Sequence, residues 1–120
     1  MRALLVVAHG SRRAASNDEV RALTEQIRSH ATKQFDYIGS AFLELAEPSI
    51  PDGLKQCIEQ GATEVVVLPY FLSAGRHVVE DIPDEVAKVT ALFPKVSIHI
   101  APYLGTAPDL PETLVNLAAK

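Results

Sequence analysis

Apolar positions along this chain follow two different periods. Four short runs rich in aliphatic and β-branched residues lie at 4–7, 38–45, 65–68 and 96–100. The first and third runs are continuous and do not alternate with polar residues, which is typical of parallel strands covered on both faces. We therefore predict strands at these four places.

The segments between and after these runs carry apolar residues at the spacing of one helix face. These positions are Val20, Leu23 and Ile27; Ile50, Leu54 and Ile58; Ile82, Val86, Val89 and Phe93; and Leu110, Leu114 and Leu117. The pattern predicts four helices that alternate with the strands. The order βαβαβαβα indicates an α/β fold, a four-stranded parallel sheet with right-handed crossovers and helices on both faces.

Short polar phrases mark the expected beginnings of these helices. Ser16 followed by Glu19 has the pattern of a capping box, in which each side chain bonds the other residue's free amide. At the other three beginnings a capping side chain (Ser49, Asp81 or Asp109) stands two residues before a proline, which the first turn of a helix tolerates.

Composition narrows the class of protein. The 120 residues are 48% hydrophobic and 22% charged, as in ordinary globular domains, and we expect one domain over 1–120. Eleven basic and fifteen acidic residues give a net charge of −4, which argues against nucleic acid as a partner. No apolar run approaches membrane-spanning length. The lone Cys57 is expected in the core, and the opening lacks a signal-peptide pattern, so we expect a cytoplasmic protein.

Function in a parallel sheet lies at the carboxyl ends of the strands, where the strand order reverses. In a flavodoxin-like order of 2-1-3-4, that place lies between the first and third strands. The most polar glycine-containing loops, 9–13 and 73–77, follow these two strands. We therefore expect His9 and His77 to face each other across one crevice.

Two imidazoles favour either metal binding or proton transfer. Glu44, at the end of the second strand, could add a carboxylate, and this set suits a divalent first-row metal. Each residue also has a structural interpretation. Either histidine could bond a neighbouring carbonyl group, and Glu44 could pair with Arg76 or Arg13. Both rings must be neutral to bind a cation, so metal affinity should fall below about pH 6.5.

Other chemistry is less well supported by the sequence. Neither a Gly-x-Gly-x-x-Gly loop nor a Walker-type Gly-Lys-Ser/Thr is present, so the common nucleotide-binding devices are missing. Arg12, Arg13 and Arg76 could bind a carboxylate-rich or phosphorylated ligand, or could be solvated surface charges.

Three segments in a fixed order carry a family resemblance. They read AHGSR at 8–12, FLELAEPSI at 42–50 and PYFLSAGRH at 69–77. Over essentially the whole chain they resemble the CbiX-type sirohydrochlorin cobaltochelatases and the related sirohydrochlorin ferrochelatases. The resemblance implies ATP-independent insertion of Co²⁺, or alternatively Fe²⁺ or Ni²⁺, into sirohydrochlorin in cobalamin or siroheme biosynthesis. The metal would be a substrate, and no permanently bound cofactor is expected.

The resemblance also implies roles for individual residues. His9 would take pyrrole protons and contact the metal, His77 would be the second metal contact, and Glu44 would line the site or touch the metal. The macrocycle would lie against the third motif, and Arg12 would help to bind its carboxylates. The expected substrate-binding residues of this motif are Phe71, Leu72, Ser73, Ala74, Gly75 and Arg76.

Full-length relatives of this family have two lobes with the site between them, whereas this chain has one chelatase lobe. The resemblance therefore implies a homodimer whose second copy supplies the other wall, with the third or fourth helix at the interface. Two alternatives remain open. The chain could be a metal or tetrapyrrole carrier without catalysis, or an inactive lobe that pairs with another chain.

Overall fold

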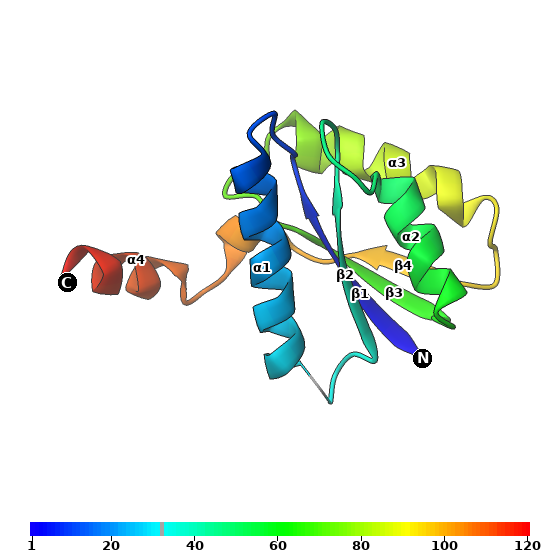
Figure 1. The fold of residues 1–120 in the computed structure, drawn as a ribbon, viewed down its shortest axis with the longest axis horizontal. Coiled ribbons are helices and arrows are strands. Elements are labelled where there is room, and N and C mark those ends of the chain that lie inside the picture. Colours follow the sequence, from blue (N-terminus) through cyan, green and yellow to red (C-terminus); the bar gives the residue numbers. More distant parts are fainter. Residues whose placement is uncertain (32) are drawn as a thin grey trace.

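A parallel sheet forms the centre of the molecule (Figure 1). The structure, a computed structural model, describes residues 1–31 and 33–120. In these residues four strands pair in parallel: β1 (Arg2–Ala8), β2 (Tyr37–Phe42), β3 (Glu64–Pro69) and β4 (Ser97–Ile100). Their order is β2-β1-β3-β4. The predicted order, with its reversal between β1 and β3, is confirmed.

Helices cover both faces of this sheet. The long helix α1 (Ala14–His30) lies on one face, and α2 (Ile50–Glu59) and α3 (Ile82–Thr90) lie on the other (Figure 1). A π-helical turn, η1 (His77–Asp81), runs directly into α3, and a 3₁₀ turn, η2 (Leu104–Thr106), precedes α4 (Leu110–Ala118). No helix among the described residues has the length and apolar composition needed to cross a membrane.

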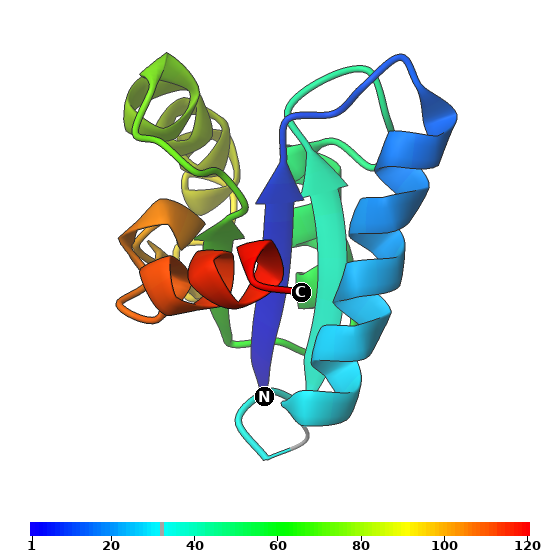
Figure 2. The same cartoon turned by 90° about the vertical axis from the view of Figure 1, so that its left-hand side faces the viewer.

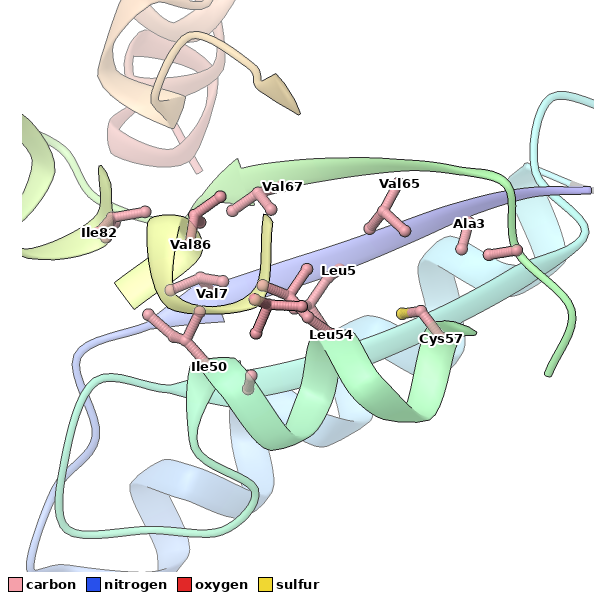
Figure 3. Packing of buried hydrophobic residues seen from close by; sticks show 13 residues of the cluster. Ala3, Leu5, Val7, Ile50, Leu54, Cys57, Val65, Val67, Ile82 and Val86 are labelled. Atoms are coloured by element: carbon pink, nitrogen blue, oxygen red, sulfur yellow. The ribbon is translucent and has the colours of Figure 1, made fainter. Parts of the chain in front are cut away.

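The larger core lies between the sheet and helices α2 and α3 (Figure 3). Leu5 of β1 and Leu54 of α2 are almost completely buried there. Helix α2 packs closely on β2 because Gly53 has no side chain, since a Cβ at that position would lie 2.9 Å from the Cβ of Ala41. Cys57 is fully buried in the same core, as predicted.

The smaller core lies under α1. It contains Leu4, Val6, Ile38 and Val66, against which Ile27 and Phe35 pack. Because side chains alternate between the two faces of a strand, odd-numbered residues of β1 serve the larger core and even-numbered ones the smaller. This division explains why the first apolar run is continuous in the sequence.

Two of the predicted helix beginnings give different outcomes. The Ser49 cap is confirmed, because its hydroxyl oxygen accepts a hydrogen bond from the Asp52 N–H at 3.2 Å. The prediction of a capping box at Ser16 is wrong. Helix α1 begins two residues earlier, at Ala14, and the Ser16 N–H already donates to the Arg13 carbonyl oxygen at 3.0 Å.

The other two capping predictions are also wrong. Asp81 has helical backbone angles, because η1 extends the helix upstream, and its carboxylate bonds the His77 ring instead of a helix amide. Asp109 makes no side-chain cap at the described start of α4, although its carbonyl oxygen accepts a bond from the Thr113 hydroxyl. The prolines do lie in the first turns, as predicted.

Helix α4 forms where the pattern predicts it but does not pack on its own sheet. Its residues are all described, and none of them is buried. Figures 1 and 2 show it on the side of the sheet that carries α1, projecting outward from the body of the molecule. The periodicity predicted which side of this helix is apolar, and it contained no information on what covers that side.

Candidate functional site

The two histidines predicted to meet do lie together, at the carboxyl ends of β1 and β3. His9 follows β1 directly, and His77 begins η1 after the loop that leaves β3. Their ring centroids are 4.5 Å apart at an interplanar angle of 71°, an edge-to-face arrangement. The two side chains are 40% and 47% exposed. Both rings are therefore accessible from solvent.

The hydrogen bonds of the two rings determine where their lone pairs point. His9 Nδ1 lies 2.9 Å from the Gly10 carbonyl oxygen, and His77 Nδ1 lies 2.8 Å from Asp81 Oδ2. Neither oxygen can donate, so Nδ1 carries the proton in both rings. A neutral imidazole has one N–H, so each Nε2 keeps a free lone pair. A carbonyl or carboxylate on the second nitrogen is typical of metal-binding histidines.

Glu44 lies beside His9, but not in the strand where the sequence pattern places it. Strand β2 ends at Phe42, and Glu44 is a loop residue whose side chain is 59% exposed. Its Oε1 atom lies 3.5 Å from His9 Nε2. Arg76 does not pair with it, because Arg76 Nε lies 3.3 Å from Glu80 Oε2. The His9 Nε2 lone pair and this carboxylate are therefore neighbouring donor groups for a cation.

Gly10 allows the Glu44 loop to approach the end of β1. Its φ is +95°, and a Cβ at this position would overlap the carbonyl oxygen of Glu44. The Glu44 N–H donates to the His9 carbonyl oxygen at 3.1 Å, and the Leu43 N–H donates to that of Ala8 at 3.0 Å. The backbone of the loop therefore continues the pairing of β1 and β2 beyond the sheet and holds Glu44 in place.

Two further residues position the site, and the sequence analysis missed both roles. Asn17 of α1 is buried, and its amide exchanges hydrogen bonds of 2.9 and 2.8 Å with the backbone of Ser11. This pair fixes the loop that follows His9. Asp81 holds the His77 ring. The i, i+4 spacing of His77 and Asp81 was a signal for that contact, because such residues are neighbours on a helix.

The loop between β3 and η1 contains most of the expected substrate-binding residues. Phe71 is half-buried against the larger core, and its ring centroid lies 6.4 Å from that of His77, so it supports that histidine. Leu72 is 69% exposed, and residues 73–76 are exposed as well. Arg12 lies exposed on the loop between β1 and α1. These side chains are thus available to a ligand.

An open groove of about 410 Å³ adjoins the histidine pair. It is lined by Leu43, Glu44, His77, Asp81, Asp84, Glu85 and Lys88. Four carboxylates against one lysine give this groove an acidic lining that favours cations. Among the described residues, no three or more His, Cys, Asp or Glu side chains are arranged to hold a metal ion.

Comparison with known proteins matches residues 3–120 to the family described as CbiX. A sirohydrochlorin ferrochelatase of Bacillus subtilis is 37% identical over 86% of this chain and 39% of its own length. A sirohydrochlorin cobaltochelatase of Sulfolobus acidocaldarius is 31% identical over 98% of this chain and 89% of its own. The chain spans 39%, 43% and 47% of the first three curated relatives that it matches.

A solved structure has the same fold. It is the sirohydrochlorin chelatase SirB from Bacillus subtilis subspecies spizizenii, in complex with cobalt, with a TM-score of 0.89 and 30% identity. The match covers 98% of this chain and 50% of that chain. One half of the larger protein therefore corresponds to nearly all of the present one.

Proposed function

Because the chain belongs to the CbiX family, we propose that it inserts a divalent metal ion, cobalt or iron, into sirohydrochlorin without ATP. The observation that carries this proposal is the pair of imidazoles, 4.5 Å apart at the strand-order reversal and each with a free Nε2 lone pair. The names of the relatives support the choice of substrate and metals. Ligand type separates Co²⁺, Fe²⁺ and Ni²⁺ poorly, so nickel is a third candidate.

In this mechanism the metal is a substrate that passes through the site. Among the described residues no three-residue metal site is preformed, so His9 and His77 bind the ion through Nε2 while the Glu44 carboxylate beside His9 attracts it. Insertion exchanges one M²⁺ for the two pyrrole N–H protons of the macrocycle, so two protons must leave. As the ion passes to the macrocycle, the freed Nε2 atoms of His9 and His77 each accept one pyrrole proton, and the Glu44 and Asp81 carboxylates stabilise the two resulting imidazolium ions. Asp81 keeps His77 oriented by accepting its Nδ1–H.

The macrocycle lies against the loop of residues 71–76, with the metal on the histidine side. Sirohydrochlorin carries many carboxylates, and Arg12 and Arg76 offer guanidinium groups at this edge. Arg76 is 81% exposed, and a substrate carboxylate can replace Glu80 in its exposed ion pair. The other wall of the cleft comes from a second copy of this chain in a homodimer.

The test is anaerobic metallation of sirohydrochlorin by Co²⁺ or Fe²⁺, followed by absorbance with and without the wild-type protein. We expect the protein to accelerate metallation, and a His30→Ala variant to match it, because His30 is exposed at the end of α1, outside the site. A changed spectrum without acceleration would identify a carrier instead. If the protein changes neither the spectrum nor the rate of metallation, the chain is an inactive lobe.

A further inference from the structure

Helix α4 exposes an apolar row that none of the described residues covers. Leu114, Val115 and Leu117 are 56%, 66% and 60% exposed. Leu110, Leu114 and Leu117 follow one another at i, i+4 and i+7, so they form one stripe. Helices shorter than about 12–15 residues are marginal in water by themselves. A nine-residue helix therefore needs a packing partner for this stripe.

The segment before α4 sets its direction. The Gly105 N–H donates to the Phe71 carbonyl oxygen at 3.0 Å, and a Cβ at Gly105 would overlap the carbonyl oxygen of Leu72. The Ala107 N–H then donates to Leu104 at 2.9 Å, and the Leu110 N–H donates to Ala107 at 3.1 Å. The helix thus leaves the sheet along a hydrogen-bonded path, away from the body of its own chain (Figures 1 and 2).

The same molecule leaves part of its sheet uncovered. On β4, Ile98 and Ile100 pack into the larger core, so His99 between them points to the opposite face and is exposed. On that opposite face Leu68 of β3 and Ala101 after β4 are only half-buried. We call Leu68, His99 and Ala101 the open β3–β4 face. It lies on the side of the sheet from which α4 extends.

We propose that α4 packs on the open β3–β4 face of a second copy of this chain, in a symmetric exchange. This inference rests on the homodimer proposed above and names its interface. In a symmetric pair, the apolar stripe of each copy packs on the open β3–β4 face of the other copy. One kind of contact then covers both surfaces. The lengths of the relatives favour a second copy as the partner. The chain matches 50% of the SirB chain, so a second copy would take the place of the other half. The match covers 89% of the Sulfolobus relative, which is therefore about as short as this chain.

The exchange also connects the interface to the site. Gly105 is bonded to Phe71, whose ring lies beside that of His77. When α4 is held by the partner, the segment before it holds the loop of residues 71–76 in place. Dimer formation therefore stabilises the substrate-binding loop in each copy.

Sedimentation equilibrium at micromolar concentration tests the helix side of this interface. Leu117→Glu places a charge in the apolar stripe, and we expect it to halve the apparent mass from that of a dimer to that of one chain. Asn116→Glu adds the same charge on the same helix but outside this stripe, and should remain a dimer. Leu117 is exposed, so the variant should fold, and its urea unfolding transition checks this.

The sheet side is tested by His99→Glu, which should weaken the dimer at least ten-fold. Its control is Gln56→Glu, an exposed position on α2 across the sheet. A Leu117→Glu protein that stays dimeric, or a His99→Glu protein with wild-type dimer affinity, overturns the exchange and leaves the homodimer standing. A monomeric wild-type chain overturns both, whereas the metallation assay independently tests the chemistry.

Discussion

At the scale of single residues, the site depends on which imidazole nitrogen carries the proton. The acceptors on Nδ1, a carbonyl oxygen at His9 and a carboxylate at His77, leave both Nε2 atoms free for a metal or a pyrrole proton. The sequence predicted that these rings meet, because topology brings the ends of β1 and β3 together. The i, i+4 spacing of His77 and Asp81 permits their contact but does not single it out, because an aspartate two residues before a proline also fits a helix cap.

The position of Glu44 shows a second limit at this scale. The apolar run 38–45 reads as one continuous strand, but strand β2 ends at Phe42 and Leu45 adopts a φ of +66°. Long-range packing against Gly10 turns the chain there, and no local pattern records that contact. Glu44 is therefore exposed beside His9 instead of lying within the sheet.

Gly10→Ala tests this packing. The added methyl group would overlap the Glu44 carbonyl oxygen in a left-handed backbone conformation, so we expect a loss of about 1–3 kcal/mol of unfolding free energy. Metallation should slow as well, because Glu44 must move. The matched control is Gly39→Ala on β2, outside the site, where the nearest atom to a Cβ is Tyr37 Cε2 at 3.4 Å, an ordinary contact. Urea unfolding and initial rates that are equal for both variants would contradict the packing.

At the scale of elements, the sequence pattern predicts the position of a strand or helix well where that element packs against other elements of the same chain. Strands β1 and β3, which contribute residues to both cores, show continuous apolar runs, and α2 shows one apolar stripe against the larger core. Helix α4 has an equally clear stripe, yet its position could not be predicted, because no part of the chain that the structure describes packs on that stripe. Amphipathicity specifies a face, and only tertiary contacts specify the partner.

Cys57 gives a pH-dependent test of the α2 packing. Burial raises the pKa of its thiol to about 11, from 9.0. Above pH 9 the unfolded chain loses this proton while the folded chain keeps it, so the free energy of unfolding should fall between pH 9 and 11, by up to about 3 kcal/mol. Below pH 9 the thiol keeps its proton in both states, so this group does not lower the free energy of unfolding there.

Urea unfolding of the wild type and of Cys57→Ala across this pH range isolates the effect. Other groups also titrate there, so the comparison is between the two slopes and not between the two stabilities. The wild type should lose more stability with rising pH than the variant does. Equal slopes would mean that the thiol is not buried as the structure describes.

At the scale of the whole molecule, one lobe presents a site with one wall. The histidine pair, the acidic groove and the loop of residues 71–76 all lie at one edge of the sheet. The larger relatives have about twice this length, and SirB matches this chain over half of its own. The proposed homodimer, with α4 exchanged, would give a short chain the second wall and would cover its apolar helix. The net charge of −4 is compatible with this role, because cations must approach the groove.

The central claim is that His9 and His77 act together on one metal ion. The most direct measurement is the rate of Co²⁺ insertion into sirohydrochlorin by wild type, His9→Ala, His77→Ala and the double variant, each shown to be folded by urea unfolding. Each single substitution should lower the rate by about 100-fold or more, and the double variant should be little slower than either. A single variant that inserts metal at the wild-type rate would contradict the claim.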